Sequence, residues 1–594
     1  MPQRIIARFS STSTSCSSSE LLKTMSDFDD EFRSDILRFR HEYKRLTLVG
    51  GEMMTTQHQS TATSQSSSSS SSGGTAVGQQ QRRPLMLDLF VLGFAIIIRI
   101  CVGYQPHSGQ DNYHGSQTAY GGDFEAQRHW MEVTTNVPIG DWYWYELEYW
   151  GLDYPPLTAY VSYLCGVGSS LLVGPESVAL VSSRGIEDPT HKAYMRATVL
   201  LLDMILFGSA VYYSTIQRDR DGALWTIVLT LCQPAILLID HGHFQYNTVA
   251  LGLAIWSFHY MTQTKFTNCI YGSILFCLAL NFKQISLYYA PAVFCYLLGR
   301  CMAVPKYFVV RFLALGITVV LTFFMLWEPF LKYGPSHLQE TTKVERVLQI
   351  LHRIFPFQRG LYESKVANLW CALSVKPFSV RERLQEQYQL PTSLGGTLIL
   401  ILPACYMLFR VGIDQQGRRY YMDRDWRQLL WGTTSTALGF FLASFQVHEK
   451  SILFALAPAS LLLWHDSDFV EWFSFVCVWT LWPLLQVDRI EVGYVAITMI
   501  FVCLHRFRRL FTRNSAPSTT VFTSYMELVP MASYVVMIAL HVAQVFVTVP
   551  SHLPDLFPVL WSVVGCGMVC MAWLCTFWKQ IDLRRKRKTK VKVQ

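Results

Sequence analysis

Long runs of apolar residues, separated by short polar stretches, recur along the chain from Leu85 to Trp578. A membrane-spanning helix needs about 20 mostly apolar residues to cross a hydrocarbon layer roughly 30 Å thick. The first such run, LMLDLFVLGFAIIIRICVGY, extends from Leu85 to Tyr104. Further candidate spans follow at 157–174, 196–216, 222–239, 246–262, 268–282, 285–300, 307–327, 393–411, 428–446, 451–464, 470–486, 489–505, 529–549 and 556–578. The pattern predicts an all-α polytopic membrane protein.

The positions of basic residues predict which ends of these spans face the cytosol, because loops rich in Lys and Arg stay on that side. Four stretches are basic: Arg82–Arg83, Arg410–Arg427, His505–Arg513 and Arg584–Lys592. They fall on one side only if the segment 157–174 lies along the membrane surface as a juxtamembrane helix. We therefore expect about 14 membrane-spanning helices, with the N- and C-termini in the cytosol.

This topology divides the chain into regions with different surroundings. The expected lumenal segments include a first loop at 105–195, the turn HGHFQYN at His241–Asn247 and the segment QVHEK at Gln446–Lys450. The expected regions are a disordered Ser-rich cytosolic tail (1–84), a transmembrane catalytic module (85–327), a large lumenal loop (328–392), a second transmembrane module (393–578) and a basic cytosolic tail (579–594).

The two ends of the chain carry possible targeting signals. The N-terminal tail is rich in Ser, Thr, Gln and Gly and has too few apolar residues to form a core. Its first residues, MPQRIIARFSSTSTSCSSS, also fit a mitochondrial transit peptide, which is rich in Arg and Ser and poor in acids. Lys590 and Lys592 occupy the fifth and third positions from the C-terminus. That spacing matches a dilysine retrieval signal and favours the endoplasmic-reticulum membrane.

The overall composition agrees with a membrane protein. Apolar residues make up 51% of the chain and charged residues only 15%, which is a low charge content for soluble domains. The formal net charge of +8 comes largely from the basic clusters at the predicted cytosolic ends of spans. The charge therefore indicates orientation in the membrane, and we expect no nucleic-acid partner.

The first lumenal loop is both acidic and aromatic. Eight carboxylates lie between Asp111 and Asp153, opposed among the permanently charged bases only by Arg128, and Trp142–Trp150 reads WYWYELEYW. Sugar-binding sites combine aromatic rings, which stack on pyranose faces, with carboxylates that accept hydrogen bonds from hydroxyls. The aromatic cluster fits an interfacial belt at the membrane surface equally well, so both interpretations stand.

Several short segments resemble one enzyme family. They are GGDFEAQRHW (Gly121–Trp130), YWGLDYPPLTAY (Tyr149–Tyr160), HFQYN (His243–Asn247), NFKQI (Asn281–Ile285), RGLYESKVANLWC (Arg359–Cys371) and SFQVHEKSIL (Ser444–Leu453). They resemble segments of the dolichyl-phosphate-glucose-dependent glucosyltransferases, over nearly the whole region from Leu85 onward. GLDYPPLTAY and SFQVHEKSIL are most similar to the member that adds the first glucose. The resemblance implies the membrane-embedded type C glycosyltransferase fold.

The resemblance also implies a reaction. Such an enzyme transfers glucose from dolichyl phosphate glucose to the terminal mannose of a lipid-linked oligomannose oligosaccharide, in the pathway that builds the N-glycan precursor. The transfer forms an α-1,3 linkage with inversion, in a single displacement on the lumenal side. Asp123 is implied as the catalytic base, which accepts the proton of the attacking hydroxyl. The residues alone leave open that Asp123 caps the helix that follows Gly122.

Candidate substrate-binding residues in the first loop have structural alternatives. Arg128 and His129 fall one helical turn beyond Glu125 and suit a phosphate, or an ion pair with Glu132. Asp153 precedes a Tyr-Pro-Pro sequence, where it either orients the acceptor or caps the following helix.

Other candidates lie at the predicted lumenal mouths of spans. Lys450, with His448, suits the phosphate that leaves the donor, whereas a snorkelling lysine is the alternative for Lys450. Ionisable groups at membrane depth are expensive and favour a function. The complete set of candidate substrate-binding residues is Glu125, Arg128, His129, Asp153, Tyr154, His243, Gln245, Lys283, His448 and Lys450.

We expect no cofactor and no obligatory metal. The chain has no Gly-rich nucleotide loop, HExxH motif or serine-hydrolase elbow, and no DxD pair lies around Asp123. The expected partners are the dolichol-linked donor and acceptor lipids and the endoplasmic-reticulum membrane. Two other functions remain open: the second glucosyltransferase of the same pathway, and a polytopic membrane transporter.

Overall fold

The computed structural model describes residues 85–110, 121–218, 222–338, 341–355, 361–362, 366–414, 419–512 and 521–593. All secondary structure in these ranges is helical, which confirms the predicted all-α class. The tail 1–84, with its possible transit peptide and the basic pair Arg82–Arg83, lies outside the described residues.

The helices fall on the predicted apolar runs and on parts of the predicted lumenal loops. Before the predicted large lumenal loop they are α3 (Leu85–Gly103), α4 (Asp123–Asn136), α5 (Pro156–Leu172), α6 (Pro189–Asp203), α7 (Ser209–Ile216), α8 (Ala223–Leu231), α9 (Pro234–Leu237), α10 (Asn247–Met261), α11 (Thr267–Phe282), α12 (Ala290–Met302) and α13 (Phe308–Lys332). From that loop onward they are α14 (Lys343–Ile354), α15 (Leu369–Leu373), α16 (Val380–Arg383), α17 (Glu386–Ile413), α18 (Arg419–Ala443), α19 (Leu453–Ser460), α20 (Ser467–Thr480), α21 (Trp482–Val487), α22 (Glu491–Thr512), α23 (Val521–Phe546) and α24 (Leu556–Val593).

Short 3-10 and π segments interrupt or extend these helices. They are η1 (Ile139–Asp141), η2 (Pro175–Val178), η3 (Met204–Gly208), η4 (Leu238–Phe244), η5 (Gln284–Tyr289), η6 (Pro305–Tyr307) and η7 (Glu449–Ile452). The π segments η3 and η4 continue α6 and α9, respectively. Such π segments occur frequently at functional sites.

Eight helical stretches of the described chain are long and apolar enough to cross a membrane, and they make the chain a multi-pass membrane protein. They are Met86–Gly103, Pro189–Ile216, Ala223–Phe244, Gln284–Met302, Pro305–Lys332, Glu386–Ile413, Val529–Phe546 and Leu556–Arg585. The other apolar helices are shorter or less apolar; α10, for example, has 15 residues and α11 has 16. The last helix, α24, continues from the final predicted span into the basic residues as far as Val593.

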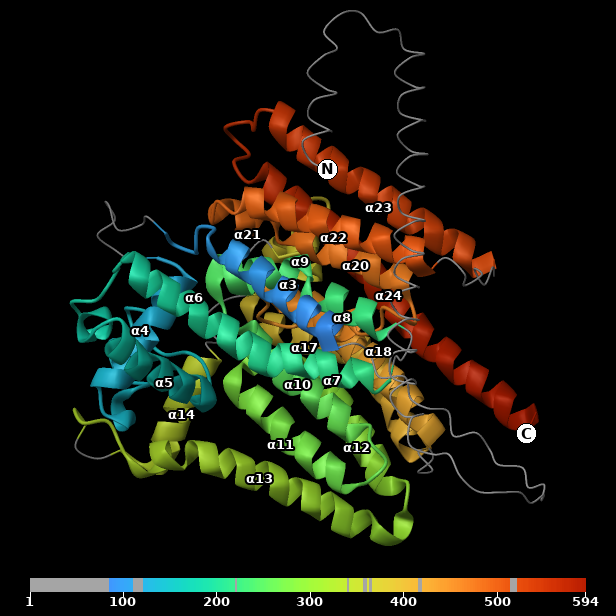
Figure 1. Cartoon of the computed structure of the whole chain (residues 1–594), viewed down its shortest axis with the longest axis horizontal. Helices are drawn as coiled ribbons and strands as arrows, with labels where there is room; N and C mark the ends of the chain where they lie inside the picture. The colour runs from blue at the N-terminus through green and yellow to red at the C-terminus, as the bar shows by residue number, and fades with distance from the viewer. Residues whose placement is uncertain are drawn as a thin grey trace, which may run out of the picture. The chain divides into compact units, whose positions relative to one another are not determined.

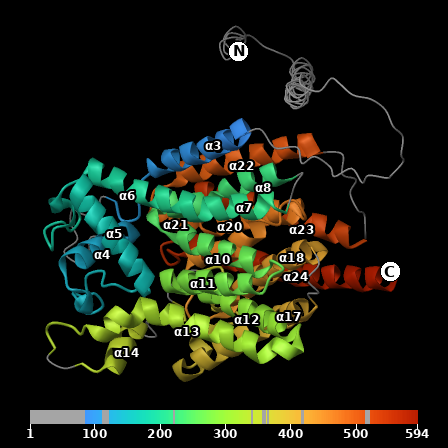
Figure 2. The same cartoon turned by 60° about the horizontal axis from the view of Figure 1, so that its bottom comes forward.

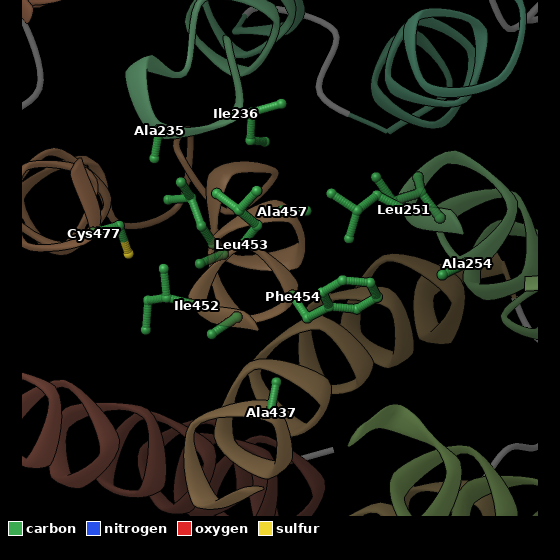
Figure 3. Packing of buried hydrophobic residues seen from close by; sticks show 14 of the residues in the cluster. Ala235, Ile236, Leu251, Ala254, Ala437, Ile452, Leu453, Phe454, Ala457 and Cys477 are labelled. Carbon is green, nitrogen blue, oxygen red and sulfur yellow. The ribbon is translucent and has the colours of Figure 1, made fainter. Parts of the chain in front are cut away.

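The core is centred on α19, whose eight residues are all buried. Figure 3 shows Leu453, Phe454 and Ala457 surrounded by apolar side chains from α9, α10, α18 and α20. A helix that is apolar on every side needs such complete cover. The η7 segment leads directly into α19 and contains Lys450. The packing of α19 therefore also fixes the position of η7.

The helices α4, α5 and α14 gather at one end of the bundle, on the left in Figures 1 and 2. A second, smaller core joins them to the end of α13. There the rings of Trp142 and Tyr143 lie 5.9 Å and 5.3 Å from the ring of Phe330. Part of the aromatic cluster of the first lumenal loop therefore packs internally.

The predicted large lumenal loop is tied to the predicted first lumenal loop through α14. The Arg353 guanidinium donates hydrogen bonds to the carbonyl oxygens of Gly151 at 2.7 Å and Leu152 at 3.2 Å. The Gln349 amide donates to the carbonyl oxygen of Tyr143 at 3.0 Å. These contacts position the backbone directly before Asp153, so the two lumenal loops form one structure at this end of the bundle.

Candidate active site

The backbone at Gly122 sets the position of Asp123. Gly122 has a φ of 94°, and a Cβ atom there would lie 2.5 Å from the carbonyl oxygen of Ser108. Only glycine fits such a conformation and such a close approach without strain. The α4 helix then begins at Asp123, whose backbone N–H donates to the Ser108 hydroxyl oxygen at 3.3 Å.

The Asp123 side chain does not cap α4. Gly122 is the N-cap residue, and no side chain caps this end of the helix, so the capping alternative for Asp123 is wrong. Instead, Asp123 Oδ2 accepts hydrogen bonds from His243 Nε2 at 2.8 Å, from the Gln245 amide and from Lys450 Nζ. Three polar donors, two from the end of η4 and one from η7, therefore converge on a single carboxylate oxygen.

The other oxygen of Asp123, Oδ1, accepts no hydrogen bond from any residue that the structure describes. The side chain is 24% exposed, so a ligand can reach it. Burial raises the pKa of Asp123, but the positive charges of Lys450 and His243 outweigh it and hold this pKa well below its usual value. The carboxylate is therefore ionised at neutral pH.

An unusual backbone presents His243 to Asp123. The π segment η4 ends at Phe244, which has a φ of 86°, and the chain then turns into α10. The Ser108 N–H donates to the His243 carbonyl oxygen at 3.0 Å, and the Arg196 guanidinium donates to that of Gly242 at 2.7 Å. A positive φ in a bulky residue is strained and persists only where its surroundings enforce it.

Asp488 completes the contacts of His243 and was not among the sequence candidates. His243 Nδ1 lies 2.5 Å from Asp488 Oδ2, and Asp488 is buried. Its sequence signal is an acid between the predicted spans 470–486 and 489–505, which resembles an ordinary polar turn. The expected topology places that turn on the same face of the membrane as His243. This shared location is the signal that could have identified Asp488 from the sequence.

Lys283 and Tyr154 contact the Gln245 side chain, which itself contacts Asp123. Lys283 Nζ donates to Gln245 Oε1 at 3.0 Å and lies 4.8 Å from the centre of the Tyr154 ring. The Tyr154 hydroxyl donates a long hydrogen bond, 3.5 Å, to the same Gln245 oxygen. These contacts orient the Gln245 amide so that its nitrogen faces Asp123.

Asp153 directly precedes Tyr154 in the chain, and His448 lies two residues before Lys450. The negative charge of Asp153 acts on Tyr154 and Lys283. His448 directly precedes η7, and its carbonyl oxygen accepts a hydrogen bond from the Ser451 N–H at 2.9 Å. Their roles in binding substrate stay predictions.

Glu125, Arg128 and His129 form a separate buried cluster on α4. Arg128 Nη2 lies 2.6 Å from Glu125 Oε1 and 2.6 Å from Glu132 Oε2, and His129 Nδ1 lies 3.2 Å from the same Glu132 oxygen. Burial raises the pKa of Glu132, but the His129 hydrogen bond and the Arg128 charge lower it to about 2. The ion pair that the sequence offered as an alternative for Arg128 is present, and a phosphate ligand there stays a prediction.

Within the described residues, no three His, Cys, Asp or Glu side chains are arranged to hold a metal ion. The chemistry of Asp123 and its neighbours is that of a carboxylate base beside cationic groups. Such an arrangement suits proton removal from a hydroxyl next to a charged leaving group.

Comparison with known proteins identifies the family. The sequence profile described as the ALG6, ALG8 glycosyltransferase family matches residues 95–575. The chain is 35% identical over 524 residues to the dolichyl pyrophosphate Man9GlcNAc2 alpha-1,3-glucosyltransferase of Saccharomyces cerevisiae, covering 82% of this chain and 90% of that protein. It is 37% identical over 508 residues to a probable enzyme of the same name from Schizosaccharomyces pombe, covering 83% and 92%.

A mammalian relative gives the same result. The Mus musculus dolichyl pyrophosphate Man9GlcNAc2 alpha-1,3-glucosyltransferase is 36% identical over 509 residues, covering 81% of this chain and 94% of that protein. The profile match begins inside α3, ends inside α24 and contains Asp123, His243, Lys450 and Asp488. The chain therefore belongs to the ALG6, ALG8 glycosyltransferase family.

Proposed function

We propose that this protein transfers glucose from dolichyl phosphate glucose to the terminal mannose of dolichyl pyrophosphate Man9GlcNAc2, in an α-1,3 linkage with inversion at the transferred carbon. The relatives' names give the acceptor and the linkage, and they favour the first glucosylation over the second. Membership of a glycosyltransferase family leaves no support for the transporter alternative.

The observation that carries the proposal is the Asp123 carboxylate, which binds three donors through Oδ2 and leaves Oδ1 to a ligand. An acceptor hydroxyl at Oδ1 loses its proton to Asp123 as its oxygen attacks the glucose. Such general-base assistance contributes typically about 10²–10⁴-fold to the rate. The carboxylate is never bonded to the sugar, so one displacement inverts the anomeric centre.

Lys450 is the group best placed to meet the donor phosphate. Its ammonium group lies beside Asp123 and 3.1 Å from His243 Nε2, and its side chain is 19% exposed. As the bond to glucose breaks, the phosphate gains a second negative charge. A cation fixed at that point stabilises the transition state more than the bound substrate. Dolichyl phosphate is then released without an acid to protonate it.

The position of this site supports the finer topology. Asp123, His243, Lys450 and Asp488 come from four segments that the expected topology places on one lumenal face, and their side chains meet. We propose about 14 spans in a type C glycosyltransferase fold, with cytosolic termini in the endoplasmic-reticulum membrane. The crossings beyond the eight long helices include α10 and α11, which have 15 and 16 residues.

The test is glucose transfer by the purified full-length protein in detergent, with synthetic dolichyl phosphate glucose. The acceptors are lipid-linked Man9GlcNAc2 and the same oligosaccharide already carrying one glucose, and dolichyl phosphate mannose is the donor control. We expect transfer of glucose only, to the unglucosylated acceptor, with an α-1,3 linkage in the NMR spectrum of the product. Transfer only to the glucosylated acceptor, or no transfer at all, would overturn the proposal.

A further inference from the structure

His243 lies between two carboxylates, and each of its ring nitrogens contacts one of them. Nδ1 lies 2.5 Å from Asp488 Oδ2, and Nε2 lies 2.8 Å from Asp123 Oδ2. A carboxylate oxygen without a proton can only accept a hydrogen bond, so each ring nitrogen must donate one. An imidazole that donates from both nitrogens carries a positive charge.

We propose that Asp488 is a positioning residue for catalysis, which holds His243 as an imidazolium in fixed orientation against Asp123. This inference rests on the proposed function, because its consequence is a property of the catalytic base. Asp488 contacts Nδ1 of His243, whereas Asp123 contacts Nε2, so Asp488 acts on the base through the imidazole ring.

The alternative protonation state is unfavourable. In it, Nδ1–H donates to Asp488, and the unprotonated Nε2 accepts a hydrogen bond from Lys450 Nζ, 3.1 Å away. The Nε2 lone pair then faces the Asp123 carboxylate at 2.8 Å with no proton between them. Two acceptors at this distance repel each other, and the repulsion is strong in a buried site.

The imidazolium also balances the charges of the site. Asp123 and Asp488 supply two negative charges, and His243 and Lys450 supply two positive ones. The repulsion between the two cations is offset because each of them contacts a carboxylate. The other titratable or charged groups near this set are Lys283 and Tyr154, which act through Gln245, then Asp153, Asp240, Arg196 and His107.

His107 does not add a charge to this balance. Burial lowers the pKa of His107 to about 3, so its ring is neutral at pH 7. Among the residues that the structure describes, Asp123 and Asp488 are the carboxylates that pair with His243, so its positive charge depends on them. Loss of the Asp488 charge alone therefore makes the ring lose its proton at a lower pH.

Unusual backbone holds both sides of the Asp488–His243 contact. Asp488 lies at the end of α21, where Arg489 has a φ of 60° and the Ile490 N–H donates to the Leu485 carbonyl oxygen at 2.9 Å. This is a Schellman turn with a residue other than glycine in the left-handed region. His243 lies in a π segment that ends in the positive φ of Phe244. Strained backbone of this kind concentrates at functional sites.

The contact has a consequence when the donor binds. If Lys450 turns toward the phosphate, His243 is the cation that still contacts Asp123 Oδ2 and keeps Oδ1 aimed at the acceptor. Asp488 would preserve this contact by keeping the ring protonated and preventing its rotation. Without Asp488, the ring loses its proton at a lower pH, and its charged contact with Asp123 is then lost.

The experiment measures kcat/KM for glucose transfer as a function of pH. The proteins compared are the wild type, the single variants Asp488→Asn, Asp488→Glu and His243→Gln, and the double variant that combines His243→Gln with Asp488→Asn. Glu491→Gln is the matched control, because it removes a carboxylate three residues away that makes none of the His243 contacts. We expect Asp488→Asn to move the alkaline limb about 1–3 pH units lower, with the acceptor KM within about twofold of wild type. Asp488→Glu should restore the limb, and in the His243→Gln background Asp488→Asn should add no further shift.

An unchanged pH profile in Asp488→Asn, or a further shift in the His243→Gln background, would overturn the inference. An active wild-type protein with such a result would leave the proposed function standing. A second measurement does not depend on the Asp488 variants: ¹⁵N spectra of histidine-labelled protein, with His243→Gln as the assignment reference. We expect two protonated ring nitrogens for His243 at pH 7, and a neutral tautomer would refute the inference.

Discussion

Replacing Lys450 by Met removes one cation from the site while keeping a side chain of similar length. Lys450 Nζ lies beside Asp123 Oδ2, and the proposed donor phosphate would bind on its exposed side. Two unit charges about 3 Å apart interact by roughly 5 kcal/mol at an effective dielectric constant of about 20. Because Lys450 is 19% exposed, solvent weakens this interaction. We take about 3 kcal/mol as the part that remains.

The loss divides between kcat and the donor KM. The phosphate carries one negative charge in the bound donor and approaches two as the bond to glucose breaks. The charge that develops gives the kcat effect, so about 3 kcal/mol corresponds to a decrease of roughly 10²-fold in kcat. The charge already present in the donor gives an accompanying increase in its KM.

The assay is steady-state glucose transfer with varied donor, comparing wild type, Lys450→Met and Lys332→Met. Lys332 is an exposed lysine at the end of α13, where its ammonium group lies over the Tyr333 ring, and its replacement removes the same charge. We expect activity near that of wild type for Lys332→Met. A kcat for Lys450→Met within about threefold of wild type, in a protein with a normal thermal unfolding temperature, would refute the assignment of Lys450 to the leaving phosphate.

Four further outcomes follow from the same structure. Arg99→Met leaves the fully buried Asp203 carboxylate without the guanidinium 2.7 Å away, and should destabilise the protein by about 3–5 kcal/mol in thermal unfolding; an unchanged unfolding temperature would contradict this. Gly122→Ala places a Cβ atom 2.5 Å from the Ser108 carbonyl oxygen and should lower kcat by displacing Asp123; full activity would show that the turn can adapt. Because the pKa of Asp123 is low, its ion pairs stabilise the fold at neutral pH and are lost only as the pH falls through that low value. Protonation of Asp123 should therefore lower neither activity nor stability between about pH 7 and 5. An acidic limb of the activity profile near pH 6 that moves in Asp123→Glu would argue against this. Glucose transfer should be unchanged after dialysis against EDTA, and activity that is lost and then restored by a divalent cation would require a metal site.

The sequence located the centre of the site but not the whole of it. Asp123, His243 and Lys450 were identified because their segments resemble a known family and because charge placed all three on one face. Both signals are local to each segment. The convergence of three donors on one oxygen of Asp123 depends on packing between α4, η4 and η7, which no local pattern encodes.

Asp488 shows why the remainder escaped. In sequence it is an acid in a short turn that also contains Arg489 and Glu491, and such turns are usually solvated. Its burial against His243 follows from a Schellman turn with positive φ at Arg489, a conformation that its residue types do not signal. For Arg128 the sequence can mislead in the other direction. Its charge suggests that it binds a ligand, but in the structure it is paired with Glu132 inside α4.

The fold was predicted at the level of class and helix positions. Apolar runs locate helices well because a span must be apolar over its whole length. They do not reveal where a helix changes to a π segment, as at Leu238–Phe244, since the hydrophobic pattern is continuous across that change. The end of α24 is hidden for the opposite reason, because the apolar run stops near Trp578 while the helix continues through basic residues to Val593.

The most direct measurement of the central claim is single-turnover glucose transfer by Asp123→Asn, with Glu176→Gln as control. Glu176 is an exposed carboxylate in η2, in the same stretch of chain between α3 and α6. The account predicts that Asp123→Asn lowers the transfer rate by about 10²–10⁴-fold while donor binding and the unfolding temperature stay close to wild type, and that Glu176→Gln transfers glucose normally. A rate for Asp123→Asn within about threefold of wild type would contradict the account and assign the base to another residue.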